Sequence, residues 1–223
     1  MRKRLKWTQG VTFMNQSTFI VRHPLIDHKM TIIRDKKTHN NEFRAIVKEI
    51  TQMIVYPATH HLSLEKKSVT TPMAEMVGHQ LANEVLVIPI MRAGLGMLDG
   101  FTTMVPIAKV GHVGFARDEK TLKATPYIIK IPKISPKTEV FILDPMLATG
   151  GTLVQAIDLI KKKGAKIITY LGLVAVQPGI DYVLKHHPDV KIYLASLDKQ
   201  LNQKGFIVPG LGDAGDRLFG QEG

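Results

Sequence analysis

Stretches rich in apolar residues, each bounded by polar or turn-forming residues, recur along the chain from residue 84 onward. The clearest runs cover residues 84–90, 140–143, 166–176 and 190–195. Apolar stretches of this length are typical of strands buried on both faces, as in a parallel sheet. Between them, apolar residues at helical spacing predict helices over residues 95–105, 153–163 and 179–187. Alternating strands and helices predict an α/β fold, with an open, mainly parallel twisted sheet flanked by helices.

The first half of the chain is less regular. A strand-like run at residues 19–21 precedes Pro24, and further elements are expected as a helix at 28–35, a helix at 42–56 and a hairpin-like edge at 62–71. Asn41 is expected to cap the second helix and Pro57 to stop it. Residues 72–81 are too irregular for a prediction. We expect residues 1–13 to be a flexible or optional extension and residues 14–223 to form a single domain.

A charged loop separates two β-rich runs in the middle of the chain. The runs cover residues 108–115 and 127–131, and the loop begins at Arg117. This pattern predicts a flexible hairpin over a site, with Arg117 at its tip placed to close on a diphosphate. The alternative is a solvated turn.

The stretch from Asp144 to Thr152 carries the strongest chemical signal. A buried strand ends in an acid, a turn of small residues and hydroxyls follows, and then a helix begins. Gly150 and Gly151 allow a ligand to approach the backbone, and the helix dipole favours an anion at the first N–H groups. No Lys follows the glycines, so the loop is not of the Walker A type, and a terminal monophosphate is expected. The alternative is a plain strand-to-helix turn.

Arg92 follows the apolar run at residues 84–90. It therefore lies at the carboxyl end of a predicted strand, the edge where open α/β sheets bind ligands. The small residues that flank it favour a role in anion binding. The alternative is a surface salt bridge.

Composition narrows the classes of function. The 223 residues suit one large domain, and the absence of cysteine excludes disulfides, thiol catalysis and cysteine-ligated metals. No apolar run approaches the roughly 20 residues that span a bilayer, so no membrane partner is expected and the cytoplasm is the expected location. The net charge of +11 suits a polyanionic ligand, although a basic surface kept for solubility is the alternative. Aromatic residues make up only 6%, and nucleic acid is not an expected partner.

The tail contains a glycine pattern, G-x-G-x-x-G, at residues 210–215. A dinucleotide site is rejected because that motif belongs to a strand–helix–strand unit, and only eight residues remain after Gly215. A tight loop is expected instead. Its backbone groups would read the edge of a flat base, since an amide offers one donor and one acceptor at fixed spacing. A pyrimidine with alternating keto and N–H groups suits that pattern.

Several separated motifs occur in an order that resembles the uracil phosphoribosyltransferase family, a branch of the type I phosphoribosyltransferases. They lie at residues 23–25, 89–94, 117–118, 144–152 and 201–220. The resemblance, which runs from about residue 19 to residue 220, implies the type I fold with a β-hairpin arm and a C-terminal base-binding loop region. The core would span about residues 80–195, and the N-terminal segment with residues 196–223 would form a hood. The implied reaction of pyrimidine salvage converts uracil and 5-phospho-α-D-ribose 1-diphosphate (PRPP) to UMP and diphosphate.

The resemblance also assigns residues. The implied PRPP-binding residues are Arg92, Arg117, Asp144, Pro145, Met146, Leu147, Ala148, Thr149, Gly150, Gly151, Thr152 and Asp213. The implied uracil-binding residues are Met146, Ala148, Phe206, Ile207, Gly212, Asp213 and Ala214. Arg117 and Asp213 would be the catalytic residues. Two features depart from the family: Phe206 stands where members usually carry Tyr, and residues 1–13 have no counterpart.

The resemblance extends to cofactor and partners. Pro145 follows Asp144 where most type I relatives carry a second acid, so Mg²⁺ is expected on the PRPP diphosphate and not in a protein metal site. A homodimer or higher homo-oligomer is implied, and GTP is a candidate allosteric activator. Two alternatives stay open: an RNA-binding regulator that keeps the fold and senses UMP, and a relative that uses another base such as orotate.

Overall fold

A mainly parallel sheet forms the centre of the computed structural model, which describes residues 11–13, 16–117 and 124–221. Its strands lie in the order β1 (Val11–Phe13), β2 (Thr18–Val21), β12 (Lys191–Asp198), β11 (Ile167–Val176), β9 (Glu139–Leu143), β5 (Val85–Met91), β7 (His112–Arg117) and β8 (Ala124–Lys130). Antiparallel pairs lie at the two ends, and the pairs between them are parallel. Short strands β6 (Lys109–Val110) and β10 (Met146–Leu147) pair with β5 and β11. The predicted α/β sheet is confirmed.

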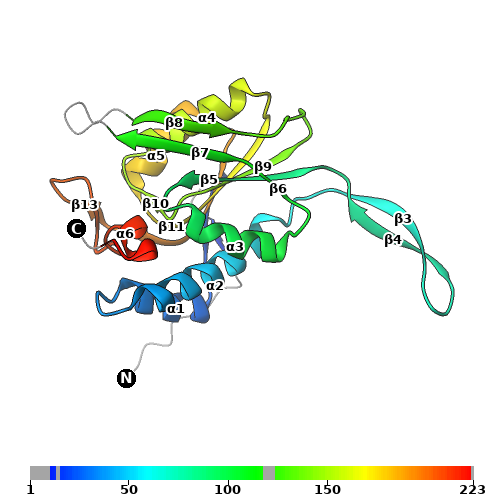
Figure 1. Cartoon of the computed structure of the whole chain (residues 1–223), viewed down its shortest axis with the longest axis horizontal. Helices are drawn as coiled ribbons and strands as arrows, with labels where there is room; N and C mark the ends of the chain where they lie inside the picture. Colours follow the sequence, from blue (N-terminus) through cyan, green and yellow to red (C-terminus); the bar gives the residue numbers. More distant parts are fainter. Residues whose placement is uncertain (1–10, 14–15, 118–123, 222–223) are drawn as a thin grey trace.

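Helices cover both faces of this sheet (Figure 1). One face packs against α1 (Pro24–Arg34), α2 (Asn40–Ala58), α3 (Leu95–Met104) and α6 (Ala214–Phe219). The other packs against α4 (Gly151–Lys162) and α5 (Gln177–His186). Because successive strand residues point to opposite faces, Tyr170 and Leu171 belong to different cores. Burial on both sides explains why these strands are apolar throughout.

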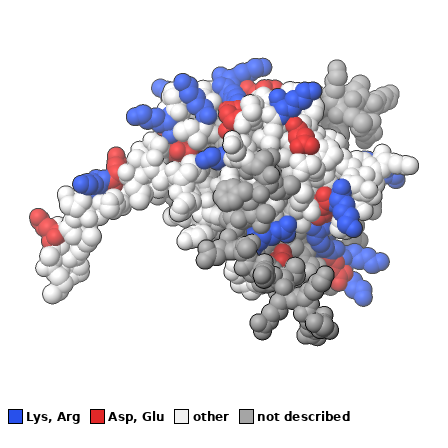
Figure 2. Space-filling view, turned by 180° about the vertical axis from the view of Figure 1, so that it is seen from behind, with Lys and Arg blue, Asp and Glu red and all other residues white. Residues whose placement is uncertain are grey.

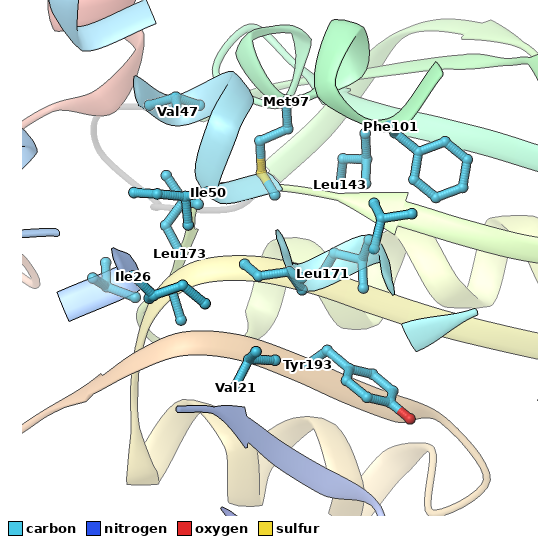
Figure 3. Close-up of a cluster of buried hydrophobic side chains, with 14 of the residues drawn as sticks. Val21, Ile26, Val47, Ile50, Met97, Phe101, Leu143, Leu171, Leu173 and Tyr193 are labelled. Atoms are coloured by element: carbon cyan, nitrogen blue, oxygen red, sulfur yellow. The ribbon is translucent and has the colours of Figure 1, made fainter. Parts of the chain in front are cut away.

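The core under α2 and α3 extends to the carboxyl ends of β9 and β11, where Leu143 and Val176 are buried. Figure 3 shows Met97 and Phe101 of α3 in the same cluster as Leu143, the last residue of β9. The Phe101 ring packs at 5.1 Å, centroid to centroid, from Phe141 of the same strand. These fully buried side chains fix the position of α3 relative to β9. They thereby also fix the position of the loop that precedes α3.

A two-stranded hairpin, called here the arm (residues 64–81), projects away from the sheet (Figure 1). It consists of β3 (Leu64–Thr70) and β4 (Glu75–Leu81), paired antiparallel. Nearly every arm residue is exposed. The predicted hairpin edge at 62–71 is therefore present, and its second strand lies in the residues for which the sequence allowed no prediction.

Two helix boundaries differ from expectation. Helix α2 begins at Asn40, so Asn41 is not its cap; His39 is the N-cap residue and makes no side-chain cap hydrogen bond. Pro57 lies inside the last turn, because the helix continues to Ala58, which is fully buried against the core. Helix α1 begins at Pro24, whose fixed φ suits the first turn.

The expected N-terminal extension contributes to the sheet where it is described. Val11–Phe13 forms β1 and pairs with β2 at the end of the sheet next to β12. Residues 1–10 lie outside the described residues. The division of the chain into an extension and a single domain stays a prediction.

Candidate active site

Three segments meet at the edge of the sheet where the central parallel strands end. They are the turn after β9, the loop after β5 and the C-terminal tail from residue 200 onward. The turn after β9 carries Asp144 and leads through β10 into α4. It encloses a cavity of about 60 Å³, lined by Asp144, Met146, Leu147, Ala148, Thr149, Gly150, Thr152 and Leu153. The structure therefore gathers most of the predicted phosphate-binding residues around one cavity.

The geometry of this turn depends on Gly150, the N-cap residue of α4. Its φ of +84° lies in the left-handed region, which glycine adopts without strain. A Cβ on Gly150 would lie 2.8 Å from the carbonyl oxygen of Gly179 in α5. The turn thus packs directly against the start of α5. It delivers the first N–H groups of α4, which have no acceptor within the helix, to the cavity edge.

Asp144 occupies an electrostatically unusual position. Burial raises the pKa of its carboxyl group to about 7, although a hydrogen bond from the Met146 N–H, at 3.4 Å, opposes the shift. The Tyr170 hydroxyl donates a 2.7 Å hydrogen bond to the Asp144 carbonyl oxygen from below. Burial and the nearby Asp144 charge also raise the pKa of Tyr170. Among the described residues, the hydrogen bond to the Asp144 carboxylate is the long one from the Met146 N–H, so the hydroxyl groups of a bound sugar could supply further donors.

The loop after β5 places Arg92 beside this turn. The peptide bond between Met91 and Arg92 is cis. Two residues later, a Cβ on Gly94 would lie 2.6 Å from the Ile90 carbonyl oxygen and would clash with the carbonyl oxygen of Leu143. The loop after β5 therefore touches the backbone of the last residue of β9, with no room for a side chain between them.

The Arg92 side chain reaches the tail. Its guanidinium lies 3.2 Å from the Asp216 carboxylate and donates a hydrogen bond to the side-chain oxygen of Gln221. The surface salt bridge considered from the sequence is thus present, but its partners belong to the predicted base-binding segment. A Cβ on Gly215 would lie 3.9 Å from the Arg92 guanidinium.

The tail folds back over the same core. A small hairpin of β13 (Gln200–Leu201) and β14 (Ile207–Val208) leads, through a cis Val208–Pro209 peptide bond, to the glycine turn and α6. Asp213 is the N-cap of α6, and its carboxylate accepts a 3.0 Å hydrogen bond from the Asp216 N–H. The G-x-G-x-x-G pattern thus runs into a helix of only six residues.

The predicted uracil-binding residues divide by burial. Ile207 and Ala214 are buried in the core beneath α2 and α3, and Met146 and Ala148 pack against that same core. Gly212 and Asp213 are exposed, and Phe206 is 46% exposed. Residues from the turn after β9 and from the tail therefore share one apolar cluster next to an exposed stretch of backbone, as a pocket for a flat base would require.

Three further charged residues hold the tail in place and were missed by the sequence analysis: Arg34, Asp198 and Arg217. Arg34 and Asp198 are 164 positions apart. No local pattern links residues so distant, and only an alignment of related sequences would have offered a signal.

Arg117 ends β7, opposite Ala124 of β8. Its side chain and residues 118–123 lie outside the described residues, so its role stays a prediction. In the described part of the chain, no group of three or more His, Asp or Glu residues is arranged to hold a metal ion. The helices that the structure describes include none long and apolar enough to cross a bilayer.

The chain is similar to several known proteins. Residues 20–221 match the family model described as uracil phosphoribosyltransferase. Uracil phosphoribosyltransferases of Bacillus licheniformis and Thermosipho melanesiensis are 51% and 52% identical to the chain, over 91% and 90% of its length and 97% of each of theirs.

Solved structures show the same fold. A protein of Aquifex aeolicus, 38% identical, superposes with a TM-score of 0.88 over 92% of this chain and 99% of its own. The adenine phosphoribosyltransferase of Trypanosoma brucei, solved with AMP, pyrophosphate and ribose-5-phosphate, has a TM-score of 0.57 at 11% identity over 87% and 89% of the two chains. The second likeness concerns the fold alone.

Proposed function

Because the chain belongs to the uracil phosphoribosyltransferase family, we propose that it transfers the phosphoribosyl group of PRPP to N1 of uracil, giving UMP and diphosphate. The observation that carries the proposal at residue level is the meeting of two binding segments. The Asp144 turn and the tail share one apolar cluster, and Arg92 links the tail to the loop that touches Leu143, the residue just before the turn.

The reaction forms a bond from uracil N1 to ribose C1 as the C1–oxygen bond to diphosphate breaks. The bonding electron pair leaves with the diphosphate, and N1 loses its proton. The protein's task is to align the two partners and to neutralise the leaving charge. We assign the 5-phosphate to the N–H groups at the start of α4, the ribose hydroxyls to Asp144, and the diphosphate to Arg92 and Arg117. Asp213, beside the base, would face both substrates.

Mg²⁺ is proposed to enter on the diphosphate. Asp144 is followed by Pro145, so the strand end offers one carboxylate where a protein cage would need several. Mg²⁺ that arrives with the diphosphate would supply positive charge, which would help to neutralise the leaving group.

We assign the base to the tail backbone. The exposed residues Gly212 and Asp213 lie next to the buried Ala214, so their amide groups can present donors and acceptors at the edge of the apolar cluster. Orotate would require a dedicated cation for its carboxylate, and residues 205–215 contain no Lys or Arg. Uracil therefore suits the loop better.

The decisive experiment is an assay of a panel of bases with PRPP and Mg²⁺, scored for nucleotide formation. Uracil should give UMP, whereas orotate, cytosine and adenine should give little nucleotide. If the protein forms no UMP and binds RNA at physiological salt, the proposal of an enzyme is wrong and the RNA-binding regulator is the better explanation.

A homodimer formed through the arm is proposed as the functional assembly. The arm exposes Leu64, Val69, Met73, Met76 and Val77, and Figure 2 shows it as a projection with few charged side chains. An isolated two-stranded hairpin is marginally stable in water, so the arm needs a surface to pack against. Sedimentation of the wild type and of a Met76→Lys/Val77→Lys variant tests this. We expect a dimer and a monomer respectively, and a monomeric wild type would contradict the proposal.

Regulation by GTP stays a proposal that the same assay can examine. If GTP is an activator, adding it at fixed substrate concentrations should raise the rate of UMP formation, whereas ATP added as a control should not. A cytoplasmic location also stays a proposal.

A further inference from the structure

The C-terminal end of α1 and the glycine turn of the tail are joined by a buried ion pair outside the residues assigned above. Arg34, the last residue of α1, faces Asp198, the last residue of β12. Its two terminal nitrogens lie 2.8 and 2.5 Å from the two Asp198 carboxylate oxygens, a bidentate arrangement. The Asp198 side chain is only 3% exposed and that of Arg34 22%, so solvent screens the pair weakly.

This ion pair holds both backbone polar groups of Gly210. The Gly210 N–H donates a 2.8 Å hydrogen bond to an Asp198 carboxylate oxygen. The Gly210 carbonyl oxygen accepts a 2.6 Å hydrogen bond from Arg34. The peptide groups on either side of Gly210 are thereby fixed in orientation, two residues before the exposed backbone of Gly212 and Asp213.

A second arginine, in the tail, binds to the end of α1. Arg217 of α6 donates hydrogen bonds to the carbonyl oxygens of Ile33 and Asp35 at the end of α1, and to the Leu211 carbonyl oxygen at 2.8 Å. Its guanidinium lies 4.3 Å from the centre of the Phe43 ring. Arg34 of α1 therefore binds the tail, and Arg217 of the tail binds the end of α1. The Leu211 carbonyl oxygen accepts its hydrogen bond from Arg217.

We propose that Arg34 and Asp198 are positioning residues for base recognition, which set the affinity for uracil by fixing the glycine turn through Gly210. The inference rests on the proposed function. With both polar groups of Gly210 and the Leu211 carbonyl bound within the protein, and with Leu211 itself buried, the exposed backbone available to a base begins at Gly212. A turn that recognises a base through its backbone needs this rigidity, because each hydrogen-bonding atom must keep its position to within about 0.5 Å.

The chemistry of the two side chains explains why an arginine and a carboxylate are suited to holding Gly210. A carboxylate accepts from Arg34 and from the Gly210 N–H at once, and the planar guanidinium donates to the carboxylate and to the Gly210 carbonyl in a fixed fork. A lysine offers a single nitrogen and cannot reproduce this fork. We therefore expect Arg34→Lys to be impaired, although it keeps the charge.

The test compares the KM values of the two substrates. In Arg34→Gln and Asp198→Asn, the KM for uracil should rise about tenfold or more, while the KM for PRPP changes by less than about threefold. The KM of Arg34→Lys for uracil should lie between the values for these variants and the value for the wild type. The control is Lys29→Gln, which removes another ion pair of α1, to Glu49 of α2, without touching the tail. Its KM for uracil should equal that of the wild type.

A single substitution leaves a buried charge without its partner and can prevent folding. The double variant Arg34→Gln/Asp198→Asn removes both charges and keeps an acceptor for the Gly210 N–H. If it is folded by thermal melting and its KM for uracil is unchanged, the inference is overturned. Equal rises in both KM values would also overturn it, since they would indicate general loosening. A wild type that forms no UMP would instead refute the proposed function, so the two failures are distinguishable.

Discussion

The guanidinium of Arg92 lies 3.2 Å from the carboxylate of Asp216, so the loop after β5 is tied to helix α6 of the tail. Both side chains are well exposed, at 51% and 37%, and the contact is correspondingly weak. The same guanidinium is the one we assign to the PRPP diphosphate. Binding of PRPP would therefore exchange the Asp216 carboxylate for a phosphate oxygen.

Removing the charge of Asp216 should ease this exchange. In Asp216→Asn, we expect the KM for PRPP to fall by about two- to fivefold, because an exposed ion pair is worth up to about 1 kcal/mol. The substitution keeps the backbone N–H that Asp213 accepts from. Arg92→Gln, the opposite change, should lower kcat/KM for PRPP by about ten- to a hundredfold. Steady-state kinetics decide the matter, and a raised KM in Asp216→Asn would show that Asp216 orients Arg92 for binding.

The turn before α4 should tolerate a methyl group at one glycine and not at its neighbour. Gly150→Ala forces alanine into a left-handed conformation and sets its Cβ 2.8 Å from the Gly179 carbonyl oxygen, so stability should fall by about 1–2 kcal/mol or more. Gly151→Ala is the matched control, since its Cβ would meet only the Thr149 hydroxyl at 3.9 Å. Urea unfolding of both variants checks this. Equal losses of stability would contradict the packing described here.

Asp144 should make the ligand-free protein less stable as the pH rises. Burial raises its pKa to about 7 in the folded protein, whereas the ordinary value of an aspartate carboxyl group, taken for the unfolded chain, is 3.8. Between these values the folded state keeps a proton that the unfolded state has released, so stability is highest at low pH and declines until the pH passes about 7. Unfolding free energies of the wild type and Asp144→Asn, measured from about pH 5 to about pH 8, should diverge by roughly 1–3 kcal/mol in favour of the variant. Parallel profiles would contradict a raised pKa.

The hydroxyl of Tyr170 should matter to the Asp144 turn and not to the base. Tyr170→Phe leaves the Asp144 carbonyl oxygen without its 2.7 Å donor, at a cost of about 1–2 kcal/mol. We expect a lower melting temperature and a raised KM for PRPP, with the KM for uracil unchanged. Tyr193→Phe is the control, because Tyr193 belongs to the core on the opposite face and stacks on Phe19 through its ring. If the two variants behave alike, Tyr170 has no special role.

The sheet and the Asp144 turn could be predicted because their signals are contiguous in the sequence. A strand buried on both faces must be apolar throughout, and Asp144 to Thr152 lie together along the chain. The second arm strand could not be predicted for the opposite reason. Only Leu81 at the base of this strand packs against the core, and residues 75–80 project beyond it, so nothing imposes a regular alternation of apolar and polar residues on them.

The support of the tail was also beyond the sequence. Arg34 and Asp198 are separated by 164 positions, and their pairing depends on where α1 ends relative to β12. The Asp144 pKa likewise arises from burial, which a sequence motif does not express. Residues that touch a ligand can form a short motif, whereas the residues that orient them are assembled by the whole fold.

The backbone contact between Gly94 and Leu143 has a consequence for protein engineering. Since no methyl group fits between Gly94 and the Leu143 carbonyl oxygen, we expect that the loop after β5 cannot be reshaped at this point unless the end of β9 changes with it. A chimera that takes the loop after β5 alone from a related transferase should therefore misfold locally. The loop after β5 and the end of β9 should be transplanted together.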